Sequence, residues 1–182
     1  MKGQGGVVWL TGLSGAGKTT IARGAAQLLE QAGYRAVVLD GDALRDGLNA
    51  DLGFSREDRL ENIRRIGEVA RLFAENGLLC IVAVISPYAA ARQAVRTRIG
   101  ANFHEVFIAA SPDVCESRDP KGLYARARRG EIAEFTGISS PYEPPVSPEL
   151  VLDTASLPAA ASIANLVEFV RARFAPPAAE RA

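Results

Sequence analysis

Short apolar runs alternate along the chain with segments that have the character of helices. The apolar runs predict buried strands at residues 7–11, 36–39, 78–85, 104–109 and 149–152. Helices are predicted between them, from the glycine-rich loop at 12–17 to about residue 32 and at 56–76, 89–99 and 156–174. The segment 56–76 is the clearest of these, because its apolar residues recur at helical spacing at Leu60, Ile63, Ile66 and Phe73.

This alternation predicts an α/β fold in three layers, with a five-stranded, mainly parallel sheet covered by helices on both faces. We expect residues 1–182 to form a single domain, with a loose lead at 1–6 and a loose tail at 175–182. Residues 118–148 are polar, rich in glycine and proline and without core periodicity, which predicts a lid over a functional site. Ligands of such sheets bind beyond the carboxyl ends of the strands, so polar residues there are the first candidates for chemistry.

The composition narrows the class of protein. The 182 residues include 21 lysines and arginines against 21 aspartates and glutamates, and 48% of them are hydrophobic. This balance argues against a disordered chain and against a protein that coats nucleic acid. No run is long enough to span a membrane, and the first apolar run is too short for a signal peptide. Cys80 and Cys115 are expected to be buried free thiols, and the protein to be cytoplasmic, without membrane or nucleic-acid partners.

A glycine-rich loop follows the first predicted strand. Its sequence GLSGAGKT fits the P-loop pattern G-x-x-x-x-G-K-S/T and leads into a predicted helix, as this motif requires. Glycines let backbone N–H groups surround phosphate oxygens, and the helix N-terminus adds a favourable dipole. The Lys18 ammonium can reach the β- and γ-phosphates, and the Thr19 hydroxyl can ligate Mg²⁺. We therefore predict that nucleotide phosphates are bound by Gly12, Leu13, Ser14, Gly15, Ala16, Gly17, Lys18, Thr19 and Thr20.

Two aspartates end the second predicted strand, in the order Asp40-Gly41-Asp42. We favour Asp42 as a functional carboxylate that orients or deprotonates an acceptor hydroxyl, or that holds Mg²⁺ through water. The alternative is an aspartate turn followed by a helix cap, a structure that aspartates form readily. Asp40 fits either a functional or a structural role.

Two clusters of cationic side chains lie beyond the strands. Guanidinium groups match sulfate and phosphate oxygens, so the first cluster suits a doubly charged small substrate: Arg45, Arg56, Arg59, Arg64 and Arg65. Within it, Arg59 and Asn62 share a helix face, whereas some of the other arginines are expected on solvated surface. The second cluster lies in the predicted lid, where one or two members are expected to be functional: Arg118, Lys121, Arg126, Arg128 and Arg129.

Phe54 and Phe135 have two interpretations each. Phe54 precedes Ser55, a good helix N-cap, so it fits a hydrophobic staple as well as it fits stacking on a flat base. Phe135 lies in the predicted lid without periodic apolar neighbours, which favours ligand contact. The spacing of residues leaves the question open for Phe54.

Taken together, these stretches resemble one known family, the adenylylsulfate (APS) kinases. The matching sequences follow one another over nearly the whole chain: GLSGAGKTT, DGDALRDGL, LGFSREDRLENIRR, ISPY, RDPKGLYARARRGEIAEFTGISSPYEPP and LDT. The P-loop alone indicates only a nucleotide-binding protein, whereas the other motifs are much more specific when they occur together. The three alanines at 89–91 depart mildly from the more polar residues common in the family.

The resemblance implies a P-loop kinase fold and a reaction. ATP donates its γ-phosphoryl group to the 3′-hydroxyl of adenosine 5′-phosphosulfate (APS), which gives 3′-phosphoadenylyl sulfate (PAPS) and ADP in sulfate assimilation. Mg²⁺ would accompany ATP, and the family is typically homodimeric. Two alternatives remain, a kinase for another acceptor and a nucleotide-binding protein without catalysis.

The resemblance also assigns roles to individual residues. Asp42, Lys18 and Ser86 are the catalytic candidates, and Thr19 and Asp42 are the metal candidates. The residues similar to those that bind APS are Asp42, Arg45, Phe54, Arg59, Asn62, Ile85, Ser86, Lys121 and Phe135. Phe54 and Phe135 are similar to the pair that sandwiches the APS adenine. The family also suggests a phosphoserine at Ser86, but no adjacent base is evident to activate this hydroxyl, so we favour a contact or support role.

Overall fold

Five parallel strands form the centre of the molecule. The computed structural model describes residues 5–176, and its sheet has the strand order β2-β3-β1-β4-β5. The strands are β1 (Gly6–Thr11), β2 (Ala36–Asp40), β3 (Leu79–Ala83), β4 (Phe103–Ala109) and β5 (Leu150–Asp153). All four strand pairs are parallel, so the predicted α/β architecture is confirmed.

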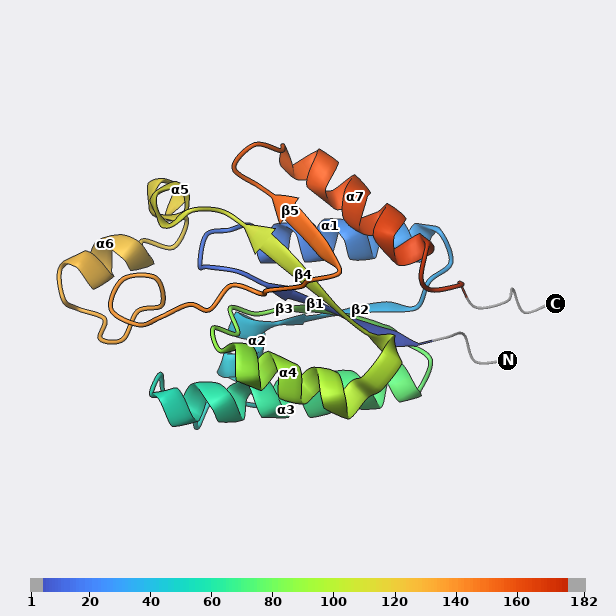
Figure 1. The fold of residues 1–182 in the computed structure, drawn as a ribbon, viewed down its shortest axis with the longest axis horizontal. Coiled ribbons are helices and arrows are strands. Elements are labelled where there is room, and N and C mark those ends of the chain that lie inside the picture. The colour runs from blue at the N-terminus through green and yellow to red at the C-terminus, as the bar shows by residue number, and fades with distance from the viewer. Residues whose placement is uncertain (1–4, 177–182) are drawn as a thin grey trace.

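Helices cover both faces of this sheet (Figure 1). On one face lie α1 (Lys18–Gln31) and α7 (Ala159–Arg171), and on the other lie α3 (Arg56–Glu75) and α4 (Ala89–Ile99). The buried strand β1 serves both layers, because alternate side chains point to opposite faces. Val8 and Leu10 pack on the side of α1 and α7, and Val7 and Trp9 pack on the side of α3 and α4.

Shorter helices follow the carboxyl ends of the strands. They are α2 (Gly41–Asp46), α5 (Pro112–Arg118) and α6 (Leu123–Arg128), and a 3₁₀ turn at Gly100–Asn102 precedes β4. In Figure 1, α5 and α6 project from the end of the molecule opposite the two chain termini. The N-cap expected at Ser55 is confirmed, because Ser55 Oγ accepts a hydrogen bond from Asp58 N (3.1 Å). Ser111 caps α5 in the same way, since its Oγ accepts a hydrogen bond from Val114 N (3.3 Å).

The structure corrects several predicted boundaries. Residues 5 and 6 are not loose: Gly6 begins β1, and a Cβ atom there would lie 2.1 Å from the Phe174 ring. The predicted lid at 118–148 contains the helical turn α6, while β3 and α7 are shorter than predicted. The expected loose lead and tail are otherwise untested, because residues 1–4 and 177–182 lie outside the described part of the chain. Within residues 5–176, no helix combines the length and apolarity needed to cross a bilayer.

Candidate active site

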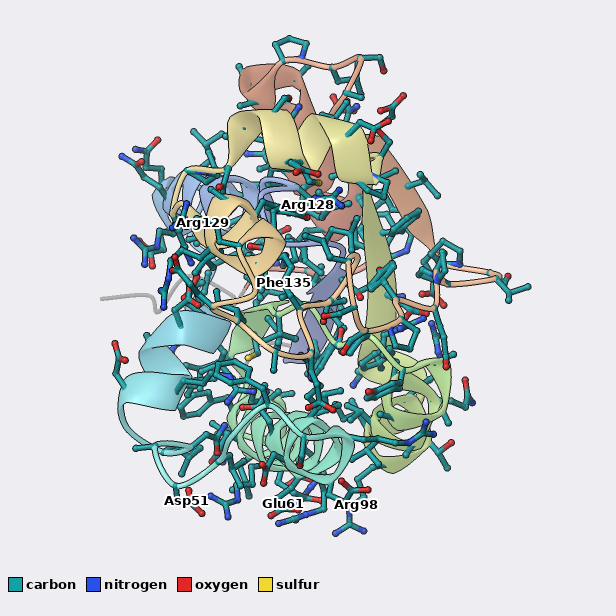
Figure 2. The ribbon with its side chains drawn as sticks, turned by 90° about the vertical axis from the view of Figure 1, so that its left-hand side faces the viewer. Asp51, Glu61, Arg98, Arg128, Arg129 and Phe135 are labelled. Atoms are coloured by element: carbon teal, nitrogen blue, oxygen red, sulfur yellow. The ribbon has the colours of Figure 1, made fainter. Side chains whose placement is uncertain are left out.

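A cavity of about 1670 Å³ opens at the carboxyl ends of the strands. Figure 2 looks onto this end of the molecule and shows Phe135 near the centre of the view. The cavity brings together most of the predicted site residues: Ser14, Gly15, Ala16, Gly17, Lys18, Thr19, Thr20, Asp42, Arg45, Phe54, Arg59, Asn62, Ile85, Ser86, Lys121 and Phe135. Gly12 and Leu13 do not line it. Leu13 lines a second, smaller cavity of about 490 Å³.

The P-loop depends on glycines at three positions. Gly12, Gly15 and Gly17 have φ angles of +153°, +76° and +102°, which L-residues rarely adopt. A Cβ atom at Gly15 would also lie 2.9 Å from Cys115 O, so the loop has no room for a side chain there. The loop is thereby shaped to turn its backbone toward the cavity, as a phosphate cradle requires.

Lys18 is buried at the base of this loop. Its ammonium group donates to Gly12 O (2.9 Å) and Leu13 O (2.7 Å). Burial lowers the pKa of Lys18 from its usual 10.5 to about 8. The side chain is thus held within the loop by two carbonyl groups, and an anion in the cavity would favour its charged form.

Asp40 connects the P-loop helix to the following helix. Its Oδ2 accepts a hydrogen bond from Thr19 Oγ1 (2.7 Å), while its Oδ1 accepts bonds from the backbone N–H groups of Asp42 (3.1 Å) and Ala43 (3.4 Å). Burial alone would raise the pKa of Asp40, but the hydrogen bonds from Thr19, Ala43 and Asp42 hold it below its usual value. Asp40 is therefore the N-cap of α2, which is the structural role that the sequence left open.

Asp42 points away from this cap. Its carboxylate forms an ion pair with the ammonium group of Lys121 from the lid, and both side chains are more than half exposed. Both residues also line the cavity. Two predicted site residues that are 79 positions apart are thus in direct contact.

Arg45 and Arg59 surround Phe54 at the lining of the cavity. Arg45 donates to the carbonyl groups of Leu52 (3.2 Å) and Gly53 (3.0 Å), and its guanidinium lies 4.4 Å from the Phe54 ring centre. Phe54 itself is 57% exposed. A hydrophobic staple would bury this ring against an apolar partner, so its exposure favours a ligand contact.

Arg59 joins the start of α3 to the lid. Its Nε donates to Phe54 O (2.8 Å), and its two terminal nitrogens donate to Thr136 Oγ1 and Glu134 O. The neighbouring Phe135 is 8% exposed and packs edge-on against Tyr124, with the ring centres 4.9 Å apart. The two phenylalanines therefore differ, since Phe54 lies in the open and Phe135 belongs largely to the core.

Five further cations of the two clusters form ion pairs on the surface, whereas the Arg56 guanidinium lies 4.9 Å from the Tyr88 ring centre. Arg64 and Arg65 pair with Glu61, and Arg65 also reaches Asp51. The lid residues Arg126 and Arg129 pair with Glu131, and Arg128 pairs with Glu116. Figure 2 shows Arg128 and Arg129 beside α6, and Asp51 and Glu61 at the opposite edge of the view.

The Ser86 hydroxyl is part of a buried hydrogen-bonded group. It accepts from Trp9 Nε1 (3.0 Å) and lies 3.0 Å from Thr11 Oγ1, to which it can donate. Ser86 has a φ of +43°, which strains the turn after β3. No carboxylate or imidazole contacts this hydroxyl among the described residues, so its surroundings are those of a structural group.

Sequence reasoning missed Arg92, which is 2% exposed and holds this turn in place. Its guanidinium donates to Glu105 Oε1 (2.6 Å), Ser86 O (2.7 Å) and Glu143 O (2.7 Å). One signal was available, because Arg92 shares a helical face with Val95 and Ile99 and therefore points inward. The contact with Glu143 could not be predicted from any local pattern, since it spans 51 positions.

Thr154 was also missed, whereas its partner Arg118 belongs to the predicted lid cluster. Arg118 donates to Thr154 O and to Thr154 Oγ1 (3.2 Å), and Thr154 Oγ1 donates to Ala16 O (2.9 Å). Both residues line the large cavity beside the P-loop. Three of the five lid cations line the large cavity: Arg118, Lys121 and Arg126.

Comparison with known proteins matches residues 4–153 to the family described as Adenylylsulphate kinase. The adenylyl-sulfate kinase of Bacillus pumilus (strain SAFR-032) is 58% identical over 169 residues, covering 92% of this chain and 86% of the relative. The adenylyl-sulfate kinase of Paraburkholderia xenovorans (strain LB400) is 57% identical over 155 residues, covering 85% and 87% of the two chains.

A solved structure of an APS kinase is also similar to this chain. The APS kinase CysC of Mycobacterium tuberculosis, in complex with AMPPNP and APS, superposes with a TM-score of 0.88 at 46% identity, covering 93% of this chain and 99% of the other. A sugar kinase from Janibacter sp. HTCC2649, at 19% identity and a TM-score of 0.63, shares the fold. With the P-loop, the Asp40-Gly41-Asp42 turn and the lid motifs all lining one cavity, the chain belongs to the adenylylsulphate kinase family.

Proposed function

We propose that this protein transfers the γ-phosphoryl group of ATP to the 3′-hydroxyl of APS, which yields PAPS and ADP. The observation that carries this proposal is the single cavity in which the P-loop faces Asp42, Phe54, Arg59 and Asn62. A volume of about 1670 Å³ is large enough for two nucleotides. The relative from M. tuberculosis, whose structure is described in complex with AMPPNP and APS, supports the same pairing of ligands.

The proposed mechanism is direct in-line transfer. The P-loop holds the ATP phosphates, and Lys18 offsets the charge that develops on the transferred group. Asp42 orients the 3′-hydroxyl and accepts its proton. When the phosphates bind, the Lys121 ammonium group leaves Asp42 and pairs with them instead. The lid then excludes water, so that ATP is not hydrolysed.

Mg²⁺ is the expected metal of this reaction. Hard cations prefer oxygen ligands, and the Thr19 hydroxyl with the carboxylates of Asp40 and Asp42 forms an oxygen donor set that fits. Thr19 would hold the ion together with the ATP phosphates, and Asp42 would contribute through water. When bound, the ion would neutralise charge on the β- and γ-phosphates.

Ser86 supports the turn beside the acceptor in this proposal. A phosphoserine relay would need a free hydroxyl with a base beside it. The contacts of Ser86 with Trp9 and Thr11 argue for a positioning role, in which the turn 85–87 presents its backbone to APS.

We further propose that the protein is a cytoplasmic homodimer. Cys80 and Cys115 are buried free thiols, which suits a reducing compartment where ATP is available. The APS kinase of Thiobacillus denitrificans is described as hexameric, which supports self-association within the family. Sedimentation of the purified chain would give the number of subunits.

The activity is tested by measuring ADP formation with ATP, Mg²⁺ and APS, and by detecting PAPS by mass spectrometry. We expect ADP release that depends on APS and a product heavier than APS by one phosphoryl group. Adenosine 5′-monophosphate and a hexose serve as competing acceptors. Faster turnover of either competitor would overturn the assignment of APS as acceptor, and nucleotide binding without any acceptor-dependent turnover would overturn the enzymatic function.

A further inference from the structure

Asn49 lies between α2 and α3 and is completely buried. Its backbone is fixed at both ends, because Asn49 N donates to Leu44 O (2.8 Å) and Asn49 O accepts from Leu52 N (3.1 Å). Its side-chain Nδ2 donates to Asn62 Oδ1 (2.9 Å). Asn49 does not line the large cavity, whereas Asn62 does. Asn49 therefore stands directly behind a residue of the candidate site.

This contact determines which end of the Asn62 amide is available. An amide has one oxygen that accepts and one NH₂ group that donates. The oxygen of Asn62 is used by Asn49. Within residues 5–176, the Asn62 NH₂ group donates to no protein acceptor, and it is not among the unpaired atoms that are fully buried. The NH₂ group is thus the end of Asn62 that is left for a ligand in the cavity.

Stability does not account for this pair. Among the described residues, Asn49 Oδ1 is buried without a hydrogen-bond donor, which destabilises a folded chain. An apolar side chain of the same shape, such as leucine, would bury no unpaired oxygen at this position. What Asn49 does supply is a donor that holds Asn62 in one of its two amide orientations.

We infer that Asn49 is a positioning residue for APS binding, and that it keeps the Asn62 NH₂ group directed at an oxygen acceptor of APS on its phosphosulfate or ribose. This inference rests on the function proposed above. Without Asn49, the Asn62 amide can rotate and present its oxygen, which repels the anionic oxygens of APS. ATP is bound at the P-loop, so its affinity should not depend on Asn49.

A double-mutant cycle tests this inference. The variants are Asn49→Leu, Asn62→Ala and the two combined, with the affinities for APS and for an unhydrolysable ATP analogue measured by calorimetry. Asn49→Ala provides a second variant in case the leucine does not fit. Ser162→Ala is a matched control, because Ser162 on α7 is also completely buried, its hydroxyl has no partner within residues 5–176, and it does not line the cavity.

We expect Asn49→Leu to weaken APS binding about tenfold, the size of one hydrogen bond to a charged group, with unchanged affinity for the ATP analogue. In the Asn62→Ala background, Asn49→Leu should have no further effect on APS binding, because the group that it positions is gone. Ser162→Ala should change neither affinity. Equal effects of Asn49→Leu in both backgrounds, equal weakening of both ligands, or unchanged APS affinity would each overturn the inference. Failure of the proposed function would instead be seen in the wild-type protein as a lack of APS-dependent turnover.

Discussion

Lys121 of the lid and Asp42 of α2 form an ion pair at the cavity. Because the two side chains are 51% and 68% exposed, the pair is screened by water and contributes little to stability. It can therefore open when a phosphate competes for the ammonium group. Lys121, which is proposed to neutralise charge, and Asp42, which is proposed to accept a proton, therefore stay paired with each other until the substrates are bound.

Asp42→Asn should lower kcat by about 10²- to 10⁴-fold, the usual contribution of a positioned acid or base. Affinity for the ATP analogue should change little, because Asp42 does not belong to the P-loop. Steady-state kinetics together with calorimetry would separate the two quantities. Asp46→Asn is the matched control on the same helix, and it should retain turnover. Near-normal turnover of Asp42→Asn would exclude the proposed role.

ATP binding should weaken above pH 8 because of Lys18. Its pKa of about 8 means that the ligand-free protein loses this charge as the pH rises, whereas bound phosphates favour the charged form. Affinity should fall up to about tenfold per pH unit above 8, with uptake of a proton on binding. Calorimetry at pH 9 in buffers of different ionisation enthalpy measures this proton.

Lys18→Arg provides the control for this pH dependence, since arginine stays charged in this range and should give a flat profile. The same pKa shift has a consequence for folding. The unfolded chain holds the Lys18 proton up to its usual pKa of 10.5, so this group makes the free energy of unfolding rise with pH between about 8 and 10.5. If the ATP affinity of the wild type depends on pH in the same way as that of Lys18→Arg, the lowered pKa of Lys18 is contradicted.

Phe54→Ala should weaken APS binding about tenfold or more, as expected for loss of an aromatic ring that stacks on a base. Stability should change little, because the ring is 57% exposed. Phe54→Tyr should restore affinity. Equal affinity of Phe54→Ala and the wild type for APS would rule out stacking.

Phe135→Ala should instead lower the free energy of unfolding by about 3–5 kcal/mol, because the Phe135 ring is buried against Tyr124. Chemical denaturation of the two alanine variants measures the contrast. A Phe135→Ala variant as stable as the wild type would mean that the ring does not belong to the core.

Gly15→Ala should bind ATP more weakly. A side chain there meets Cys115 O and forces the loop out of shape, in addition to the strain of a φ of +76°. Gly33→Ala is the matched control, since Gly33 has a φ of +87° with open space around it. Both variants should lose stability by about 1–2 kcal/mol, but only Gly15→Ala should lose nucleotide affinity. Similar nucleotide affinities of the two variants would argue against a rigid cradle.

Ser86→Ala should retain turnover within about tenfold of the wild type while losing about 1–3 kcal/mol of stability, because Trp9 Nε1 loses its acceptor. Kinetics and denaturation of the same preparation provide both values. Complete loss of turnover in a folded Ser86→Ala protein, together with phosphoserine detected in the wild type, would favour the relay.

Local patterns were sufficient for the strands and for the glycine-rich loop. Val7 to Leu10 form an unbroken apolar run because β1 is buried on both faces, and such a short run followed by a glycine-rich loop is typical of a buried parallel strand. The sequence separated the arginines of the cavity from those of the surface only in part. Arg59 was separated from Arg64 by its spacing to Asn62, but its hydrogen bonds to the lid span about 75 positions and have no local signature.

The least predictable residues act from behind the cavity. Asn49 and Arg92 line no part of it, and their importance comes from partners 6 to 51 positions away. The exposure of the Phe54 ring was equally unpredictable, because a residue before an N-cap is buried or exposed according to what packs against it. Tertiary contacts decide such cases, and a single sequence does not carry them in its spacing.

The carboxyl group of Asp40 has a consequence for the geometry of the reaction. One of its oxygens is bonded to Thr19 on the P-loop helix, and the other to the first turn of α2, where Asp42 lies. A single carboxyl group thus ties the P-loop helix directly to the backbone of the turn that carries Asp42. This connection does not involve the lid, because neither Thr19 nor Asp42 belongs to residues 118–148.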